Sequence, residues 1–146
     1  MNSVAIDGLM GMASDEQQIR ELIERWADAA HTGDLEKSSP TTPRTVVMFD
    51  VPPPHDGVRG IDAYGATWPP FFEWQAQGAV FEIVSLEMTV GDDVAYANAL
   101  LRCGTPEELD AQPAKRLRLT VGLRKEQGRW LVAHEHHSFP QNGEPG

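Results

Sequence analysis

The clearest periodic signal in the chain is an apolar stripe at helical spacing between residues 14 and 33. Apolar side chains recur there every three or four positions, which places them on one face of a helix. Ser14, with Gln17 three residues later, forms a capping-box pattern at the start, and Gly33 is a typical C-terminal stop. The stripe consists of Ile19, Leu22, Ile23, Trp26 and Ala30.

The second half of the chain has the two-residue alternation of β-strands instead. Tight turns at residues 91–93 and 126–128 and a polar loop at 104–114 divide it into four strands, which we expect to pair as an antiparallel meander. Strict alternation would put Phe81 and Ile83 on one face and Leu86 and Met88 on the other. The predicted strands are 79–90, 93–103, 115–126 and 129–139.

The region between these two patterns is shorter in its elements and rich in proline. Residues 44–51 are β-branched and apolar, so they predict a strand that closes at Asp50 or Val51, just before three consecutive prolines. Residues 61–78 begin with a helical pattern, which Pro69 and Pro70 should limit.

Helices that precede a run of antiparallel strands indicate an α+β fold. We expect the N-terminal helices to pack on the concave face of a curved, mostly antiparallel sheet in one domain. The predicted domain covers residues 14–139, with a flexible N-terminal arm at 1–13 and a disordered tail at 140–146.

Charge and composition narrow the function classes. The formal net charge of −10 over 146 residues disfavours nucleic acid and anionic membranes as partners, because both are negatively charged. No apolar run approaches the ~20 residues that span a bilayer, and the N-terminus does not have the pattern of a signal peptide. The chain has one cysteine, Cys103, so an internal disulfide is impossible and a cytoplasmic location is expected.

The candidate chemistry is concentrated in the last strand, WLVAHEHHSFP at 130–140. Alternation predicts that Trp130, His134 and His136 share one face, and that Glu135 and His137 share the other. His134 and His136 have no third ligand beside them, so we predict no metal site. We expect them instead on a hydrogen-bonded sheet surface or, with Trp130, in a homodimer interface.

The helix ERWADAAHTGDLE, the strand and turn VVMFDVPPPHDGVRG, and the closing GRWLVAHEHHS resemble the SnoaL-like and ketosteroid-isomerase-like proteins. These belong to the nuclear-transport-factor-2-like superfamily, whose fold is a cystatin-like α+β cone. The resemblance covers residues 14–139. It implies a deep apolar pocket between the concave sheet and the helices, and a homodimer formed through the sheet.

The resemblance also implies roles for single residues. In steroid isomerases the general base is the acidic residue that ends the first strand before a proline-containing turn, and Asp50 holds that position. Their oxyanion-binding tyrosine is replaced here by Trp26, and the strand at 115–125 contains no counterpart of their protonated aspartate. Steroid isomerisation itself is therefore not implied.

In related assembly domains the residue before the final serine of the last strand points into the pocket, and His137 holds that place. This implies that Glu135 and His137 face the pocket, where they could act as an acid/base pair near neutral pH. The alternative is a structural ion pair of Glu135 with Arg44 or Arg59. Asp50, likewise, is either the proton acceptor or only the cap of the proline turn.

Aromatic side chains before the sheet suit a flat, polycyclic ligand, although each can equally be part of the core. For Tyr64, which could donate a hydrogen bond to a ligand, a surface position is the favoured alternative. The candidate ligand-binding residues are Trp26, Tyr64, Trp68, Phe71 and Phe72.

Three functions remain open from the sequence. The first is a cofactor-independent enzyme of the isomerase or cyclase type, which acts by general acid/base catalysis through Asp50, Glu135 and His137 on an apolar, carbonyl-bearing molecule. No Gly-rich phosphate loop is present to suggest a nucleotide cofactor. The second is a non-catalytic binding domain for an apolar small molecule, and the third is a dimerising assembly module.

Overall fold

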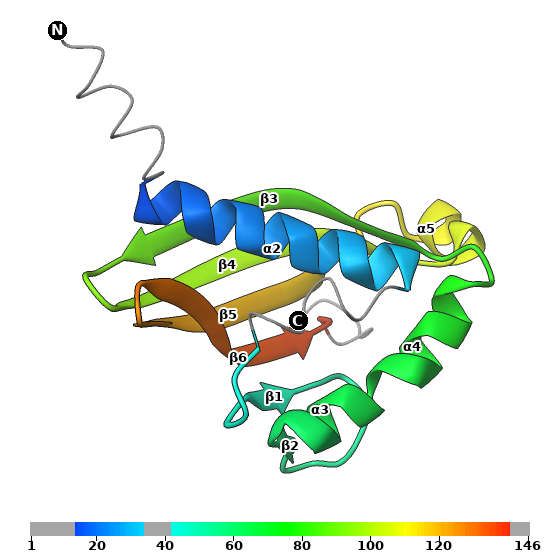
Figure 1. Cartoon of the computed structure of the whole chain (residues 1–146). Helices are drawn as coiled ribbons and strands as arrows, with labels where there is room; N and C mark the ends of the chain where they lie inside the picture. The colour runs from blue at the N-terminus through cyan, green and yellow to red at the C-terminus, as the bar shows by residue number, and fades with distance from the viewer. Residues whose placement is uncertain (1–13, 34–41, 141–146) are drawn as a thin grey trace, which may run out of the picture.

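The computed structural model describes residues 14–33 and 42–140, and it confirms the α+β fold. Figure 1 shows one long helix, α2, lying across a curved sheet, with shorter helices α3 and α4 at the end of the sheet beside β1 and β2. The predicted arm at 1–13 and residues 141–146 of the predicted tail lie outside the described residues.

The long helix α2 (Asp15–Thr32) is the one that the apolar stripe predicts. Its first turn is capped as expected, because the backbone N–H of Gln17 donates to Ser14 Oγ at 3.1 Å. Its C-terminus stops at Gly33, whose φ of 81° is a left-handed conformation that glycine adopts without steric cost. The stripe is buried against the concave face of the sheet.

The sheet has six strands in the order β2-β1-β6-β5-β4-β3. The predicted four-stranded antiparallel meander is confirmed, because β3, β4, β5 and β6 pair in sequence order. The short first strand, β1, pairs in parallel with β6. A two-residue strand, β2, was not predicted. The strands are β1 (Val47–Phe49), β2 (Val58–Arg59), β3 (Val80–Val90), β4 (Val94–Gly104), β5 (Leu117–Glu126) and β6 (Arg129–Ser138).

Proline positions explain two differences from the predicted helices. Pro69 and Pro70 lie in the first turn of α4 (Trp68–Gln75), directly after α3 (Ile61–Ala66), so they begin a helix instead of limiting one. A proline is tolerated there because a first-turn N–H has no intrahelical partner to lose. The segment predicted as a polar loop likewise contains α5 (Pro106–Ala111), whose capping box joins Thr105 and Glu108.

Two β-bulges overturn the strict alternation predicted for the strands. In β3 the register moves from Ile83↔Leu101 to Ser85↔Leu100, which leaves Val84 without a partner. As a result, side chains before and after the bulge face the same side, and both sets pack against the core. Those side chains are Phe81, Ile83, Leu86, Met88 and Val90.

The bulge in β6 corrects the predicted position of Trp130. The register moves from Leu123↔Val132 to Gly122↔His134, so Ala133 is the unpaired residue. Trp130 therefore faces the helices together with Glu135, and its indole is only 3% exposed. Its Nε1–H donates to Asp15 Oδ1 at 3.1 Å, which ties the last strand to the first turn of α2. The prediction that Trp130 lies in a dimer interface is wrong.

No helix within residues 14–33 and 42–140 is long and apolar enough to cross a membrane.

Replacement of Trp130 tests the corrected orientation. We expect Trp130→Ala to lower the free energy of unfolding by about 3–5 kcal/mol, because it empties a buried aromatic site and removes one of the two side-chain hydrogen bonds that Asp15 Oδ1 accepts, leaving the one from Lys125. Urea denaturation measures this loss. Leu131→Ala, on the neighbouring and partly exposed position, is the matched control and should cost much less. Equal losses for the two variants would contradict the assignment.

Candidate active site in the cavity between sheet and helices

A cavity of about 400 Å³ lies between the concave face of the sheet, α2 and the α3–α4 pair. Its size is in the range of small-molecule sites in proteins. Most of its wall is apolar, with seven phenylalanine, tryptophan and tyrosine rings from both helices and sheet, and a few polar groups converge on it. The polar side chains are Asp50, Tyr64, Thr67, Glu108, Lys115, Glu135 and His137.

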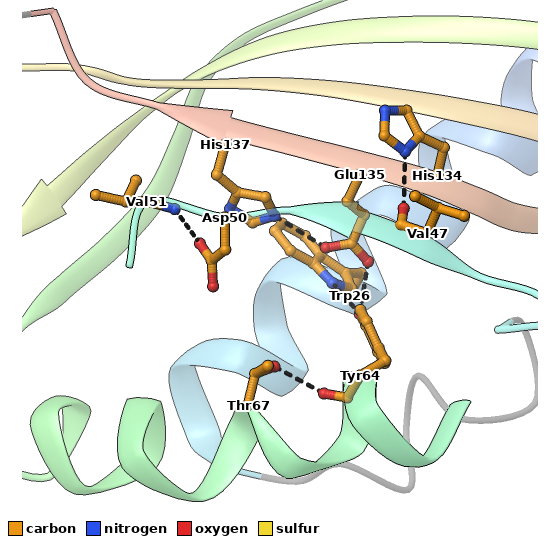
Figure 2. Close-up of polar contacts among 9 residues, drawn as sticks. All are labelled: Trp26, Val47, Asp50, Val51, Tyr64, Thr67, His134, Glu135 and His137. Atoms are coloured by element: carbon orange, nitrogen blue, oxygen red, sulfur yellow. Dashed lines mark hydrogen bonds and ion pairs between the residues drawn. The ribbon is translucent and has the colours of Figure 1, made fainter. Parts of the chain in front are cut away.

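Glu135 is the most deeply buried charged residue at the cavity, with 2% of its surface exposed. Both of its carboxylate oxygens are bonded, as Figure 2 shows. Tyr64 Oη donates to Oε2 at 2.5 Å, and His137 Nε2 lies 2.9 Å from Oε1. Among the described residues the ion-pair partner of Glu135 is His137, and not Arg44 or Arg59 as the alternative proposed. Nη1 of Arg59 donates instead to the backbone oxygen of Asp56.

Tyr64 is 2% exposed, so the favoured surface position is wrong. Its hydroxyl also accepts a hydrogen bond from Trp26 Nε1–H at 3.4 Å, which links α2 to α3. Burial, together with the charge of Glu135 and the bond to it, raises the pKa of Tyr64 well above its ordinary value. The phenol therefore stays protonated and serves as a permanent donor to Glu135.

His137 lies two residues after Glu135 on β6, and its side chain is 11% exposed at the cavity wall. Burial by itself lowers the pKa of an imidazole. The hydrogen bond to Glu135, the charge of Glu135 and the charge of Asp50 oppose this and together raise the pKa of His137 above its ordinary value. The arrangement favours an imidazolium whose Nε2–H donates to Glu135, which leaves Nδ1 for a ligand.

Asp50 follows β1 directly and lines the same cavity. Its Oδ1 accepts a hydrogen bond from the backbone N–H of Val51 at 2.8 Å, so it does cap its own turn. Within the part of the chain that the structure describes, its second oxygen has no such partner. Figure 2 shows Asp50 on the side of the His137 ring away from Glu135. The three candidate catalytic residues are thus brought to one cavity.

The predicted aromatic residues divide into two groups. Trp26, Trp68 and Phe71 line the cavity, whereas Phe72 is not part of its wall and packs against Trp68 with ring centroids 5.2 Å apart. Around α4, Phe71 at three residues and Phe72 at four residues after Trp68 lie on opposite sides of Trp68, and only the side of Phe71 lines the cavity.

Sequence reasoning missed three aromatic residues of the wall, Trp74, Phe81 and Phe139. Trp74 continues the three-residue spacing of Trp68 and Phe71, so the helical period could have identified it. Phe81 contacts both helices, with ring centroids 5.6 Å from Trp26 and 5.3 Å from Phe71. Nothing in the local sequence signals that contact, because it joins three separate elements.

A charged group lies at another part of the wall, near α5. Lys115 Nζ is 3.2 Å from Glu108 Oε2 and 4.7 Å from the centre of the Phe139 ring. Cys103, also in the wall, is a buried free thiol, and burial raises its pKa to about 12. A thiol in that state is a poor nucleophile at neutral pH.

The other two histidines of β6, His134 and His136, face away from the cavity. His134 Nδ1 lies 2.7 Å from the carbonyl oxygen of Val47, and both His134 and His136 contact the Phe49 ring on the outer face of the sheet. Within the described ranges, no three His, Cys, Asp or Glu side chains are grouped so that they could hold a metal ion.

Solved structures with this fold include two relatives that carry the nuclear-transport-factor-2-like description. One, of unknown function, comes from Pseudomonas putida and is 34% identical, with 86% of each chain covered and a TM-score of 0.71. The second, from Novosphingobium aromaticivorans, is described as having a cystatin-like fold. It is 18% identical over 97% of this chain and 92% of its own, with a TM-score of 0.71.

A third structure, from Shewanella frigidimarina, has a provisional ketosteroid isomerase assignment. It is 17% identical over 88% of this chain and 98% of its own, with a TM-score of 0.66, so it supports the fold alone. No curated protein matches the chain. The family model of the SnoaL-like domain matches residues 19–142, nearly the whole domain. On this match and on the 34% identity to the Pseudomonas putida protein, the chain belongs to the SnoaL-like family within the nuclear-transport-factor-2-like fold.

Proposed function

We propose that this protein is a cofactor-independent enzyme that moves a proton on an apolar, carbonyl-bearing molecule bound in the cavity. The observation that carries the proposal is that a carboxylate, Asp50, and an imidazole, His137, line the same apolar cavity. One carboxylate oxygen of Asp50 is bonded to the backbone of Val51, and the other has no hydrogen-bond partner among the described residues; His137 is hydrogen-bonded to buried Glu135, which raises the pKa of its imidazole. A base and an acid at the wall of one cavity are the groups that enolisation of a bound carbonyl compound requires.

Asp50 acts as the general base in this proposal. Its carboxylate takes the proton from the carbon next to the carbonyl, and the electron pair of that C–H bond moves toward the carbonyl oxygen. His137 gives its Nδ1 proton to that oxygen, so the product of the step is a neutral enol. The reverse steps return a proton to the same or another carbon, which completes an isomerisation or prepares a cyclisation.

Glu135 and Tyr64 are positioning residues in this scheme. Both oxygens of Glu135 are already bonded and only 2% of the residue is exposed, so it orients His137 and stabilises its charge without touching a ligand. Tyr64 donates its hydroxyl proton to Glu135, so that proton is not available for a hydrogen bond to a ligand. The aromatic wall of Trp26, Trp68 and Phe71 would hold flat apolar parts of the substrate.

A binding domain without catalysis is the second candidate. The observation in its favour is that Asp50 already accepts a hydrogen bond from Val51 and so has a structural task in the turn. In that case the cavity binds an apolar molecule and the carboxylate only shapes its wall. Exchange of substrate protons separates the two candidates.

We expect Asp50→Asn to abolish proton exchange while leaving binding intact. The probe is 1-(2-naphthyl)ethanone in D₂O, with deuterium incorporation next to its carbonyl followed by NMR. Loss of a positioned general base should slow the catalysed exchange by about 10²–10⁴-fold. Binding, followed by quenching of tryptophan fluorescence, should stay within about twofold because the amide keeps the size and shape of the carboxylate.

The matched control is Asp56→Asn, which changes an exposed aspartate of the same turn that does not line the cavity. It should exchange at the wild-type rate. Tight binding by the wild type with no catalysed exchange would overturn the enzyme proposal in favour of the binding domain.

The charge state of His137 provides a second prediction. Glu135→Gln removes the negative partner, so the pKa of His137 should fall, which NMR titration of its ring protons measures. Because the folded-state pKa of His137 is raised, its protonation stabilises the fold fully below the ordinary value of 6.5 and ceases to do so as pH rises through the folded value. The stability advantage of the wild type over the variant should therefore shrink as pH rises through that window.

Glu87→Gln, on an exposed position of β3, is the control and should leave the titration of His137 unchanged. An unchanged pKa of His137 in Glu135→Gln would show that the dyad does not set its charge.

We also propose that two copies pair through the outer face of the sheet, and we retain a cytoplasmic location as a prediction. Support comes from large apolar side chains exposed on that face of β4, where Tyr96 is 54% and Leu100 40% exposed. Tyr96→Asp combined with Leu100→Asp should convert a dimer to a monomer in sedimentation experiments, whereas Ala63→Asp on exposed α3 should not. A wild-type monomer at all concentrations would contradict the proposal.

A further inference from the structure

A second, smaller cavity of about 270 Å³ lies beside the first, beneath the proline turn. The two cavities share part of their walls, so they are neighbouring spaces. The shared residues are Met48, Asp50, Pro52, Thr67 and Pro70. The side cavity alone is lined by Pro53, Pro54, Gly57, Val58 and Ala66.

The turn that roofs the side cavity is packed closely on β1. A Cβ atom on Gly57 would lie 2.6 Å from the carbonyl oxygen of Met48 and would also meet the Phe49 ring. The φ of 78° at Gly57 is a further reason for glycine at this point. The side cavity therefore lies under a turn that follows β1 closely, and Asp50 stands where β1 passes into that turn.

The two cavities differ in the chemistry of their walls. The main cavity has flat aromatic surfaces from Trp26, Trp68 and Phe71, among others. The side cavity has no aromatic residue in its wall and is formed mainly by proline, valine, alanine and methionine side chains. Flat rings gain from stacking and edge contacts with aromatic walls, whereas a saturated chain needs only close aliphatic contact.

We infer that the side cavity is a second subsite, which takes a saturated aliphatic substituent of a ring-bearing ketone. The ring system lies in the aromatic cavity, the substituent lies under the proline turn, and the carbon between the carbonyl and the substituent lies at Asp50. The inference rests on the proposed function in its placement of the reacting carbon. It narrows the substrate class to aryl or polycyclic ketones with an alkyl arm.

The size of the side cavity supports this occupant. A dry cavity of about 150 Å³ in a protein core already binds benzene, and the side cavity is larger at about 270 Å³. A short alkyl chain fits that space, and its aliphatic wall offers no ring on which an aromatic group could stack. Each methylene that leaves water contributes about 0.8 kcal/mol, or about a fourfold gain in affinity.

The test compares two probes that differ only in the alkyl arm, 1-(2-naphthyl)ethanone and 1-(2-naphthyl)hexan-1-one. Binding is followed by quenching of tryptophan fluorescence, since Trp26, Trp68 and Trp74 all line the main cavity. We expect the hexanone to bind at least tenfold more tightly to the wild type. Ala66→Phe, which fills the side cavity from α3, should remove that gain and leave the affinity for the ethanone unchanged.

Ala63→Phe is the matched control. Ala63 is exposed on the same helix and lines neither cavity, so its variant should keep the full preference for the hexanone. Ala66→Leu is a smaller second variant in case the phenyl group prevents folding, and it should remove part of the gain. The inference is overturned if the wild type binds both ketones equally, or if Ala66→Phe and Ala63→Phe keep the same preference.

The outcomes for the subsite and for the proposed function are separate. A chain-length preference that depends on Ala66, without catalysed deuterium exchange, supports the subsite and removes the enzyme. Catalysed exchange that depends on Asp50, with no chain-length preference, supports the enzyme and removes the subsite.

Discussion

The buried carboxylate of Glu135 is the interaction on which the rest of the site depends. A charge with 2% exposure is costly unless its oxygens are satisfied, and here Tyr64 takes one oxygen and His137 the other. Because Tyr64 also accepts from Trp26, the same group joins β6, α3 and α2. The network therefore ties these three elements together and favours the charged form of His137 at the cavity wall.

Two β-bulges decide which side chains meet in that network. Without the unpaired Ala133, Trp130 and Val132 would lie on the face opposite to Glu135 and His137. With it, Trp130 at the start of β6 is buried in the core, and His137 near the end of β6 lines the cavity on the same face. The bulge at Val84 likewise brings side chains from both ends of β3 to one face, where Phe81 lines the cavity and Leu86 packs against the core.

The position of Asp50 connects the proposed chemistry with the proposed substrate. A strand of three residues ends at Phe49, and the chain then turns through consecutive prolines, which cannot continue a ladder of hydrogen bonds. The carboxylate is thus left at the border of an aromatic cavity and an aliphatic one. In this arrangement a base at the border can reach a carbon that joins a flat ring system to a saturated arm.

The sequence by itself determined the long helix and the four-stranded meander, because period, caps and turns are local signals. Alternation placed Glu135 and His137 on one face of the last strand, and the family resemblance pointed to Asp50 and His137 as residues at the pocket. Only the tertiary structure decided the bulges, the burial of Tyr64 and Trp130, and the departure of Phe72 from the wall. A bulge results from pairing with a neighbouring strand and the curvature of the whole sheet. A buried tyrosine results from a partner distant in sequence, here the carboxylate of Glu135, and neither leaves a mark in the residues nearby.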